Sequence, residues 1–132
     1  MKDKITILIL AYYLPGNKVG GPLVSILNLI KNLSETFDFN VITPDRDFGE
    51  NTPYPSIESN KWLDLNGIPV FYLALKPFAL FVLLNQIRKK TDEKTIIYLN
   101  SVFNSLLSIS VVLYKRVGFL KKSNIIIAPR GE

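Results

Sequence analysis

A pair of glycines near the N-terminus lies where a loop could bind a phosphate or a sugar. Gly20 and Gly21 lie in the segment Pro15–Pro22, directly before Pro22, where a helix is predicted to begin. Because glycine has no Cβ, the backbone there can approach a ligand closely, and a helix N-terminus favours negative charge. The spacing is neither that of a Walker A loop nor that of the dinucleotide fingerprint. A ligand-binding loop and an ordinary glycine turn therefore remain equal alternatives.

Three polar residues follow the second predicted strand. Asp45 and Asp47 are carboxylates on either side of Arg46. The three side chains could hydrogen-bond sugar hydroxyls, or they could form a solvated turn, which is the favoured interpretation.

Polar residues also follow the fourth and fifth predicted strands. Asn100 and Ser101 could line the same site, although capping of the next helix is the favoured role. Arg130 could hold a phosphate or carboxylate through two hydrogen bonds, and its alternative is an exposed terminus without fixed geometry.

The composition excludes several classes of chemistry. The 132 residues contain no cysteine and no histidine, so thiol nucleophiles, disulfides, Ser–His–Asp triads and His-bound metals are absent. The net charge is +5, and its basic clusters lie at predicted helix ends or in connections, where they suit the helix dipole. We prefer that role to contact with anionic lipid. No aromatic-interleaved basic stripe is present, so no nucleic-acid partner is expected.

Strands and helices alternate along the chain. Apolar runs predict five strands, at Ile5–Leu10, Asn40–Thr43, Pro69–Leu75, Thr95–Leu99 and Ile125–Ala128. Helical spacing predicts helices from Pro22 to Leu33, from Phe78 to about Lys90, and between Ser101 and Gly118. The pattern predicts an α/β fold with a doubly wound, mainly parallel sheet and helices on both faces.

Two segments have alternative interpretations. Residues Asp45 to Gly67 lack periodicity, which indicates a functional or a disordered loop. The apolar side chains of Phe78–Leu84 are interpreted as core, and a helix that dips into a membrane is left open.

The apolar run after Lys4 is interpreted as a buried strand and not as a signal peptide, since no small-residue cleavage site follows it. No run reaches the roughly 18–20 apolar residues of a membrane span.

Four sequence segments together resemble a known family. They are ILILAYYLPGNKVGGPLVSILNLIKNL, NVITPDRDFGE, YLNSVFN and IIIAPRGE, and they extend through the whole chain in order. They are similar to the N-terminal half of the bacterial family 4, or group 1, glycosyltransferases, which assemble cell-surface polysaccharides.

The resemblance implies a GT-B fold, in which two Rossmann-like domains face each other across a cleft. Residues 1–132 would be a single, incomplete acceptor-side domain, inactive alone, and the C-terminal donor domain would be missing. The substrates would be a nucleotide-sugar and a glycan or lipid-linked acceptor. No cofactor and no metal would be needed, and the location would be cytoplasmic, with peripheral contact at the inner face of the membrane left open.

The resemblance also suggests roles for the candidate residues. Gly20 and Gly21 would close on the diphosphate of the donor. The acceptor side would be lined by Asp45, Arg46, Asp47, Asn100 and Ser101. Arg130 and Glu132 fall near a position where relatives carry a histidine, which this chain lacks, so they are weak catalytic candidates.

Two other functions remain open at this stage. The chain could be a stand-alone module that binds a phosphorylated sugar or a nucleotide without catalysis. It could also be a membrane-apposed partner subunit that acts through its basic helix ends and the apolar helix near Phe78.

Overall fold

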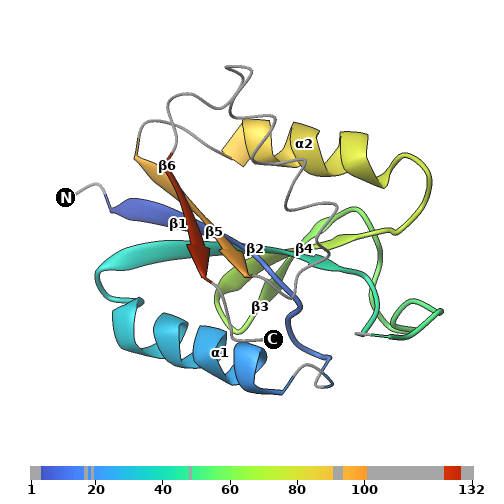
Figure 1. Cartoon of the computed structure of the whole chain (residues 1–132), viewed down its shortest axis with the longest axis horizontal. Helices are drawn as coiled ribbons and strands as arrows, with labels where there is room; N and C mark the ends of the chain where they lie inside the picture. Colours follow the sequence, from blue (N-terminus) through green and yellow to red (C-terminus); the bar gives the residue numbers. More distant parts are fainter. Residues whose placement is uncertain are drawn as a thin grey trace.

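Six strands form one sheet in the computed structural model (Figure 1). The structure describes residues 4–16, 18, 20–47, 49–90, 94–100 and the strand 124–128. The strands are β1 (Ile5–Leu10), β2 (Phe37–Pro44), β3 (Trp62–Leu65), β4 (Ile68–Leu73), β5 (Thr95–Asn100) and β6 (Asn124–Ala128). The two helices of the described part are α1 (Gly21–Leu33) and α2 (Ala79–Lys90).

The strand order identifies the type of sheet. The order is β3-β4-β2-β1-β5-β6, with every neighbouring pair parallel except β3 with β4. If the five parallel strands are numbered along the chain, they lie in the order 3-2-1-4-5 of a Rossmann-like sheet. The strand order reverses its direction between β1 and β5, and in open parallel sheets ligands bind beyond the strand ends at such a reversal.

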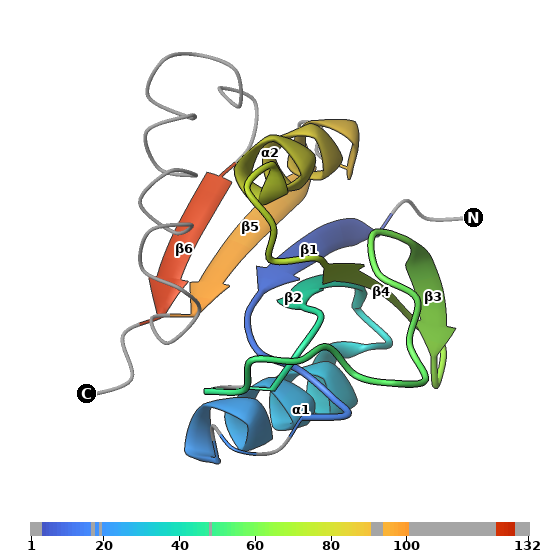
Figure 2. The same cartoon turned by 90° about the vertical axis from the view of Figure 1, so that its right-hand side faces the viewer.

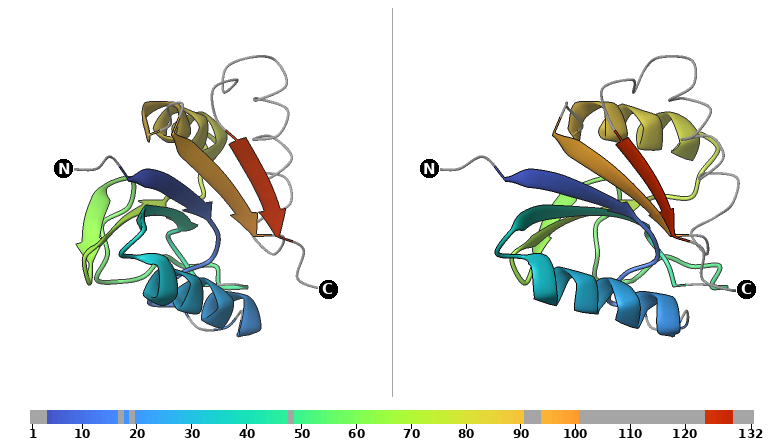
Figure 3. Two further views of the ribbon diagram at one scale, coloured as in Figure 1. Left: turned by 90° about the vertical axis from the view of Figure 1, so that its left-hand side faces the viewer. Right: turned by 60° about the vertical axis from the view of Figure 1, so that its left-hand side comes forward.

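The two helices cover opposite faces of the sheet (Figures 2 and 3). Alternate residues of β1 point to the two sides. Leu8 and Leu10 belong to the cluster under α2, whereas Ile7 and Ile9 belong to the cluster under α1. This two-sided burial explains why β1 is an unbroken apolar run, as parallel strands between two helical layers are. The α/β fold and the mainly parallel sheet are thus confirmed.

The predicted strands and helices in the described part are present with shifted ends. The β1 bounds are as expected, and β2 is longer than the predicted Asn40–Thr43. Residues 74 and 75 follow β4 instead of ending it. The helix expected between Ser101 and Gly118 lies outside the described residues.

The interpretation of Phe78–Leu84 as core was wrong for Phe78 and Phe81, which are each 71% exposed, because α2 buries the face that carries Leu83 and Ile87. Neither described helix has the length and the apolar character that a membrane span requires.

The prediction for the segment from Asp45 to Gly67 was wrong in part. Its last residues form β3, which joins β4 through the two-residue turn Asn66–Gly67. Both turn residues have positive φ, 52° and 86°, the conformation of a type I′ turn. Asparagine and glycine tolerate this conformation, and its twist matches that of a hairpin.

Candidate functional site

The loops that follow β1 and β2 meet at the carboxyl edge of the sheet. Both helices begin at this edge, as the right-hand view of Figure 3 shows. Residues 11–20 connect β1 to α1, and residues 45–61 connect β2 to β3. The candidate site is built from contacts within and between these two loops. The loops contain four of the predicted site residues, Gly20, Asp45, Arg46 and Asp47.

The glycine pair lies at the start of α1, as predicted. Gly20 has φ 68° and Gly21 is the first helical residue, and both are exposed. A Cβ at either position would meet no atom within 4 Å. The positive φ requires glycine at position 20, whereas no neighbouring atom requires it at position 21.

Hydrogen bonds already occupy part of this helix start. The Gly20 carbonyl accepts the N–H groups of Leu23 and Val24, at 3.1 and 3.2 Å. The second helical residue is a proline and has no N–H to donate. The Gly21 N–H is therefore the first-turn donor that a bound anion would use.

Gly16 allows the two loops to pack closely. A Cβ on Gly16 would overlap the Tyr54 hydroxyl oxygen, and it would lie only 2.6 Å from Oδ1 of Asp47. The same Asp47 oxygen accepts the N–H of Lys18 at 3.3 Å. The Lys18 ammonium also forms an exposed ion pair with Glu50. Asp47 thus contacts the loop that leads to the glycine pair.

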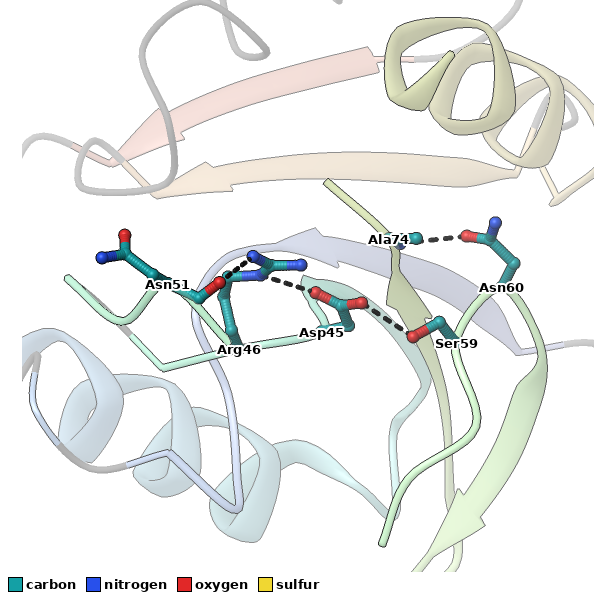
Figure 4. Close-up of polar contacts among 6 residues, drawn as sticks. All are labelled: Asp45, Arg46, Asn51, Ser59, Asn60 and Ala74. Carbon is teal, nitrogen blue, oxygen red and sulfur yellow. Dashed lines mark hydrogen bonds and ion pairs between the residues drawn. The ribbon is translucent and has the colours of Figure 1, made fainter. Parts of the chain in front are cut away.

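Asp45 is buried deeply, more so than the neighbouring Arg46 and Asp47, and Figure 4 shows its contacts. Its residue exposure is 3%, and both carboxylate oxygens accept hydrogen bonds. Oδ1 accepts from Nε of Arg46 at 2.9 Å, and Oδ2 accepts from Oγ of Ser59 at 2.7 Å. Arg46 also donates through Nη1 to the Asn51 carbonyl at 2.7 Å. Asp45 and Arg46 therefore hold the loop together from inside.

Backbone and amide contacts join the same loop to the end of β4. The Asp45 N–H donates to the Leu73 carbonyl at 2.9 Å. The Asn60 N–H donates to the Tyr72 carbonyl at 2.7 Å, and the Asn60 side-chain oxygen accepts the Ala74 N–H at 3.0 Å. These bonds extend the hydrogen bonding along β4 beyond the residues that pair with β3, and they attach the loop to the sheet.

Tyrosines fill the space beneath the two loops. The Tyr72 hydroxyl donates to the Leu14 carbonyl at 2.7 Å. The ring of Tyr54 meets that of Tyr72 edge to face, with 6.1 Å between centroids. Burial raises the pKa of Tyr72 to about 12, with a further contribution from Tyr13. Burial also raises the pKa of Tyr54, and the charge of Asp47 adds to that effect.

Two buried hydroxyl groups lack hydrogen bonds within the described part of the chain. They belong to Thr43, at the end of β2, and to Tyr54. The Gly16 N–H lies near the Tyr54 oxygen, but it donates to the Tyr13 carbonyl at 3.1 Å. The Tyr54 hydroxyl is therefore held by packing rather than by a hydrogen bond.

The other predicted site residues are not brought to this site by described contacts. Asn100 is the last residue of β5, which is the strand beside β1 at the reversal of the strand order, and the backbone of Asn100 alone is described. Ser101, Arg130 and Glu132 lie outside the described residues. Sequence reasoning missed Gly16, Ser59 and Tyr54, whose roles depend on contacts between loops that are far apart in sequence.

The arrangement can present the Gly21 N–H and the exposed backbone of Gly20 and Gly21 at the carboxyl edge of the sheet. Comparison of the chain with protein-family models, curated proteins and solved structures finds no match. Within the described residues, no three acidic, cysteine or histidine side chains gather as a metal site would require. The geometry of this edge and the sequence segments described above are therefore the basis of the proposed function.

Proposed function

We propose that this chain is the acceptor-side, N-terminal part of a GT-B glycosyltransferase of the bacterial family 4 type. The complete enzyme would transfer a sugar from a nucleotide-sugar to a glycan or lipid-linked acceptor in the synthesis of cell-surface polysaccharide. In this proposal the sheet belongs to a doubly wound domain, and a second domain binds the donor nucleotide. The chain alone would be inactive.

One observation carries the proposal. The Gly20–Gly21 pair lies at the start of the first helix after β1, and β1 flanks the reversal in strand order where such sheets bind ligands. The exposed backbone at Gly21 can approach a diphosphate closely, and the N-terminus of α1 favours its charge. The resemblance of the four sequence segments to the family implies the same role for these glycines, beside the donor.

The contacts of the site suggest a division of roles. Asp45 and Arg46 bind each other and their own loop, so in the proposed enzyme they position that loop rather than contact the acceptor. Asp47 contacts the loop after β1 through Lys18. The chemistry would depend on holding the reactants and stabilising the leaving diphosphate by charge.

The test joins this chain to a donor-binding domain, encoded downstream or supplied separately, and measures nucleoside diphosphate release from a panel of sugar nucleotides. Turnover is expected from the combined protein and not from the chain alone. Gly21→Leu should lower turnover by about tenfold or more, because a side chain there would displace the diphosphate. Asn28→Leu, at an exposed position on the same helix, is the matched control.

Two results would count against the proposal. A well-folded combined protein without turnover and without sugar-nucleotide binding would refute it. Sugar-nucleotide binding by the chain alone, lost in Gly21→Leu and without turnover in the combined protein, would instead support a stand-alone binding module.

A further inference from the structure

Tyr72 contacts both of the loops that meet at the carboxyl edge of the sheet. It lies near the end of β4 and is buried, with 2% of its surface exposed. Its hydroxyl donates to the carbonyl of Leu14, in the loop after β1, at 2.7 Å. In the loop after β2, Tyr54 packs against its ring and the Asn60 N–H donates to its carbonyl. One residue of β4 thus joins two loops that are distant from it in sequence.

Hydrogen bonds attach the backbone of the loop after β1 to neighbouring segments at Ala11, Leu14 and Lys18. The Ala11 N–H donates to the end of β2 at 3.2 Å, and the Lys18 N–H donates to Oδ1 of Asp47 at 3.3 Å. The bond from Tyr72 to Leu14 lies between these points and is the shortest of the three. It is also part-buried, whereas the bond at Lys18 is exposed, so water competes less with it.

The same loop ends at the glycine pair, which has no close packing of its own. A Cβ on Gly20 or Gly21 would meet no atom within 4 Å. The buried side chain of Leu23 holds the first turn of α1 from the helix side. From the other side, the direction in which the backbone enters the helix depends on the loop that Tyr72 holds at Leu14. The orientation of the Gly21 N–H therefore depends on both attachments.

We propose that Tyr72 is a positioning residue for the glycine pair: its hydroxyl holds the loop after β1 so that the Gly21 N–H meets the diphosphate of the sugar nucleotide. This inference rests on the proposed function, which supplies the diphosphate. Tyr72 is buried and acts through the loop rather than by contact with the ligand. Loss of its hydrogen bond would let the loop adopt other positions, and apparent affinity falls with the fraction of protein in the competent one.

A purely structural role would account for the ring of Tyr72 but not for its hydroxyl. The ring belongs to the apolar cluster under α1, where phenylalanine would supply similar packing. Burial of a hydroxyl costs free energy unless it finds a partner, and here the partner is the loop carbonyl of Leu14. The two roles predict different results, because a structural role affects stability alone, whereas a positioning role also affects the glycine pair.

The first test reads the position of the loop directly. Tyr72→Phe removes the hydroxyl and keeps the ring, so the amide signals of Gly20 and Gly21 should shift in the nitrogen-15 NMR spectrum of the full chain. Gln86→Leu is the matched control, because it removes the acceptor of a part-buried hydrogen bond of 2.9 Å from Nε1 of Trp62, on the opposite face of the sheet. The control should leave both glycine signals in place. Unchanged glycine signals in Tyr72→Phe would overturn the proposal.

The second test uses the chain combined with a donor-binding domain. Tyr72→Phe should raise the KM for the sugar nucleotide by about fivefold, the effect of one hydrogen bond on the population of the competent loop. The kcat and the KM for the acceptor should stay nearly unchanged. An unchanged KM for the sugar nucleotide, or an equal rise in Gln86→Leu, would overturn the proposal. Absence of turnover in the combined wild type would refute the proposed function instead, and the glycine signals would still decide whether Tyr72 positions the loop.

Discussion

Replacing Gly16 by alanine tests whether the loop after β1 is held by close packing against the loop after β2. The added Cβ would overlap the Tyr54 hydroxyl oxygen, and it would lie 2.6 Å from Oδ1 and 2.9 Å from Cγ of Asp47. Cβ contacts below 3.0 Å are essentially never seen, so at least one neighbour must move. The Asp47 carboxylate can rotate. The Tyr54 ring cannot move as easily, because it packs against Tyr72.

The expected destabilisation follows from this geometry. Overpacking of a well-packed region costs about 1–3 kcal/mol, and we expect about 2 kcal/mol for Gly16→Ala. With an unfolding entropy of about 2.1 cal/mol/K per residue, this corresponds to a decrease in Tm of roughly 7 °C for a chain of this length.

The variant Tyr54→Phe distinguishes the clash with the Tyr54 hydroxyl from the other effects of Gly16→Ala. The Tyr54 hydroxyl has no hydrogen bond to lose, so the single variant should be neutral or stabilised by up to about 1 kcal/mol. In the Tyr54→Phe background Gly16→Ala should cost only about 1 kcal/mol, which gives a coupling of about 1 kcal/mol between the two positions.

Urea unfolding followed by the fluorescence of Trp62, the single tryptophan, measures each free energy of unfolding. Gly21→Ala is the matched control, because a Cβ there would meet nothing within 4 Å and no positive φ opposes it. It should leave stability unchanged or slightly raised. If Gly16→Ala unfolds with the wild-type free energy, or if its effect is the same with and without Tyr54→Phe, the packing argument is wrong.

Two further predictions concern stability. Asp45→Ala should destabilise the chain by about 3 kcal/mol, because it leaves the half-buried Arg46 without its carboxylate. Ser59→Ala removes a single hydrogen bond to Asp45 and should destabilise the chain by only about 1 kcal/mol. Equal effects of the two variants on the free energy of unfolding in urea would contradict this ranking. Alkaline pH should destabilise the fold through Tyr72, whose pKa is raised from 10.0 to about 12. Folding favours the protonated phenol, so stability should be constant below pH about 10 and then fall by up to about 1.4 kcal/mol per pH unit until pH about 12. Tyr72→Phe should remove this contribution and leave that of Tyr54, whose pKa burial also raises, so the fall should become shallower. An unchanged slope would refute the assignment.

The sequence was sufficient to predict the parallel part of the sheet. Apolar runs such as Ile5–Leu10 are buried on both faces, so their composition alone marks them as central strands. β3 was missed because Trp62–Leu65 is short, only partly buried and follows a proline-rich loop. The Asn66–Gly67 pair between two apolar segments was the available signal, since this dipeptide favours a hairpin turn.

The candidate site was predictable in position and less so in detail. Strand ends placed Gly20, Asp45 and Asp47 at one edge of the sheet, and the structure has them there. The burial of Asp45 could not be foreseen, because its partner Ser59 lies 14 positions away in a segment without regular pattern. The role of Gly16 likewise depends on Tyr54, which reaches it through tertiary packing alone.

The short hairpin strand β3 has a consequence for the solubility of the chain. It pairs with the edge of β4 from Ile68 to Phe71, and the β4 residues from Val70 to Leu73 are all buried. An uncovered strand of that composition would be a template for pairing with other chains. β3 replaces it with an edge of four residues that carries the exposed carboxylate of Asp64, and a charge on a short edge opposes the addition of a further strand. The hairpin thus disfavours aggregation through this edge of the sheet.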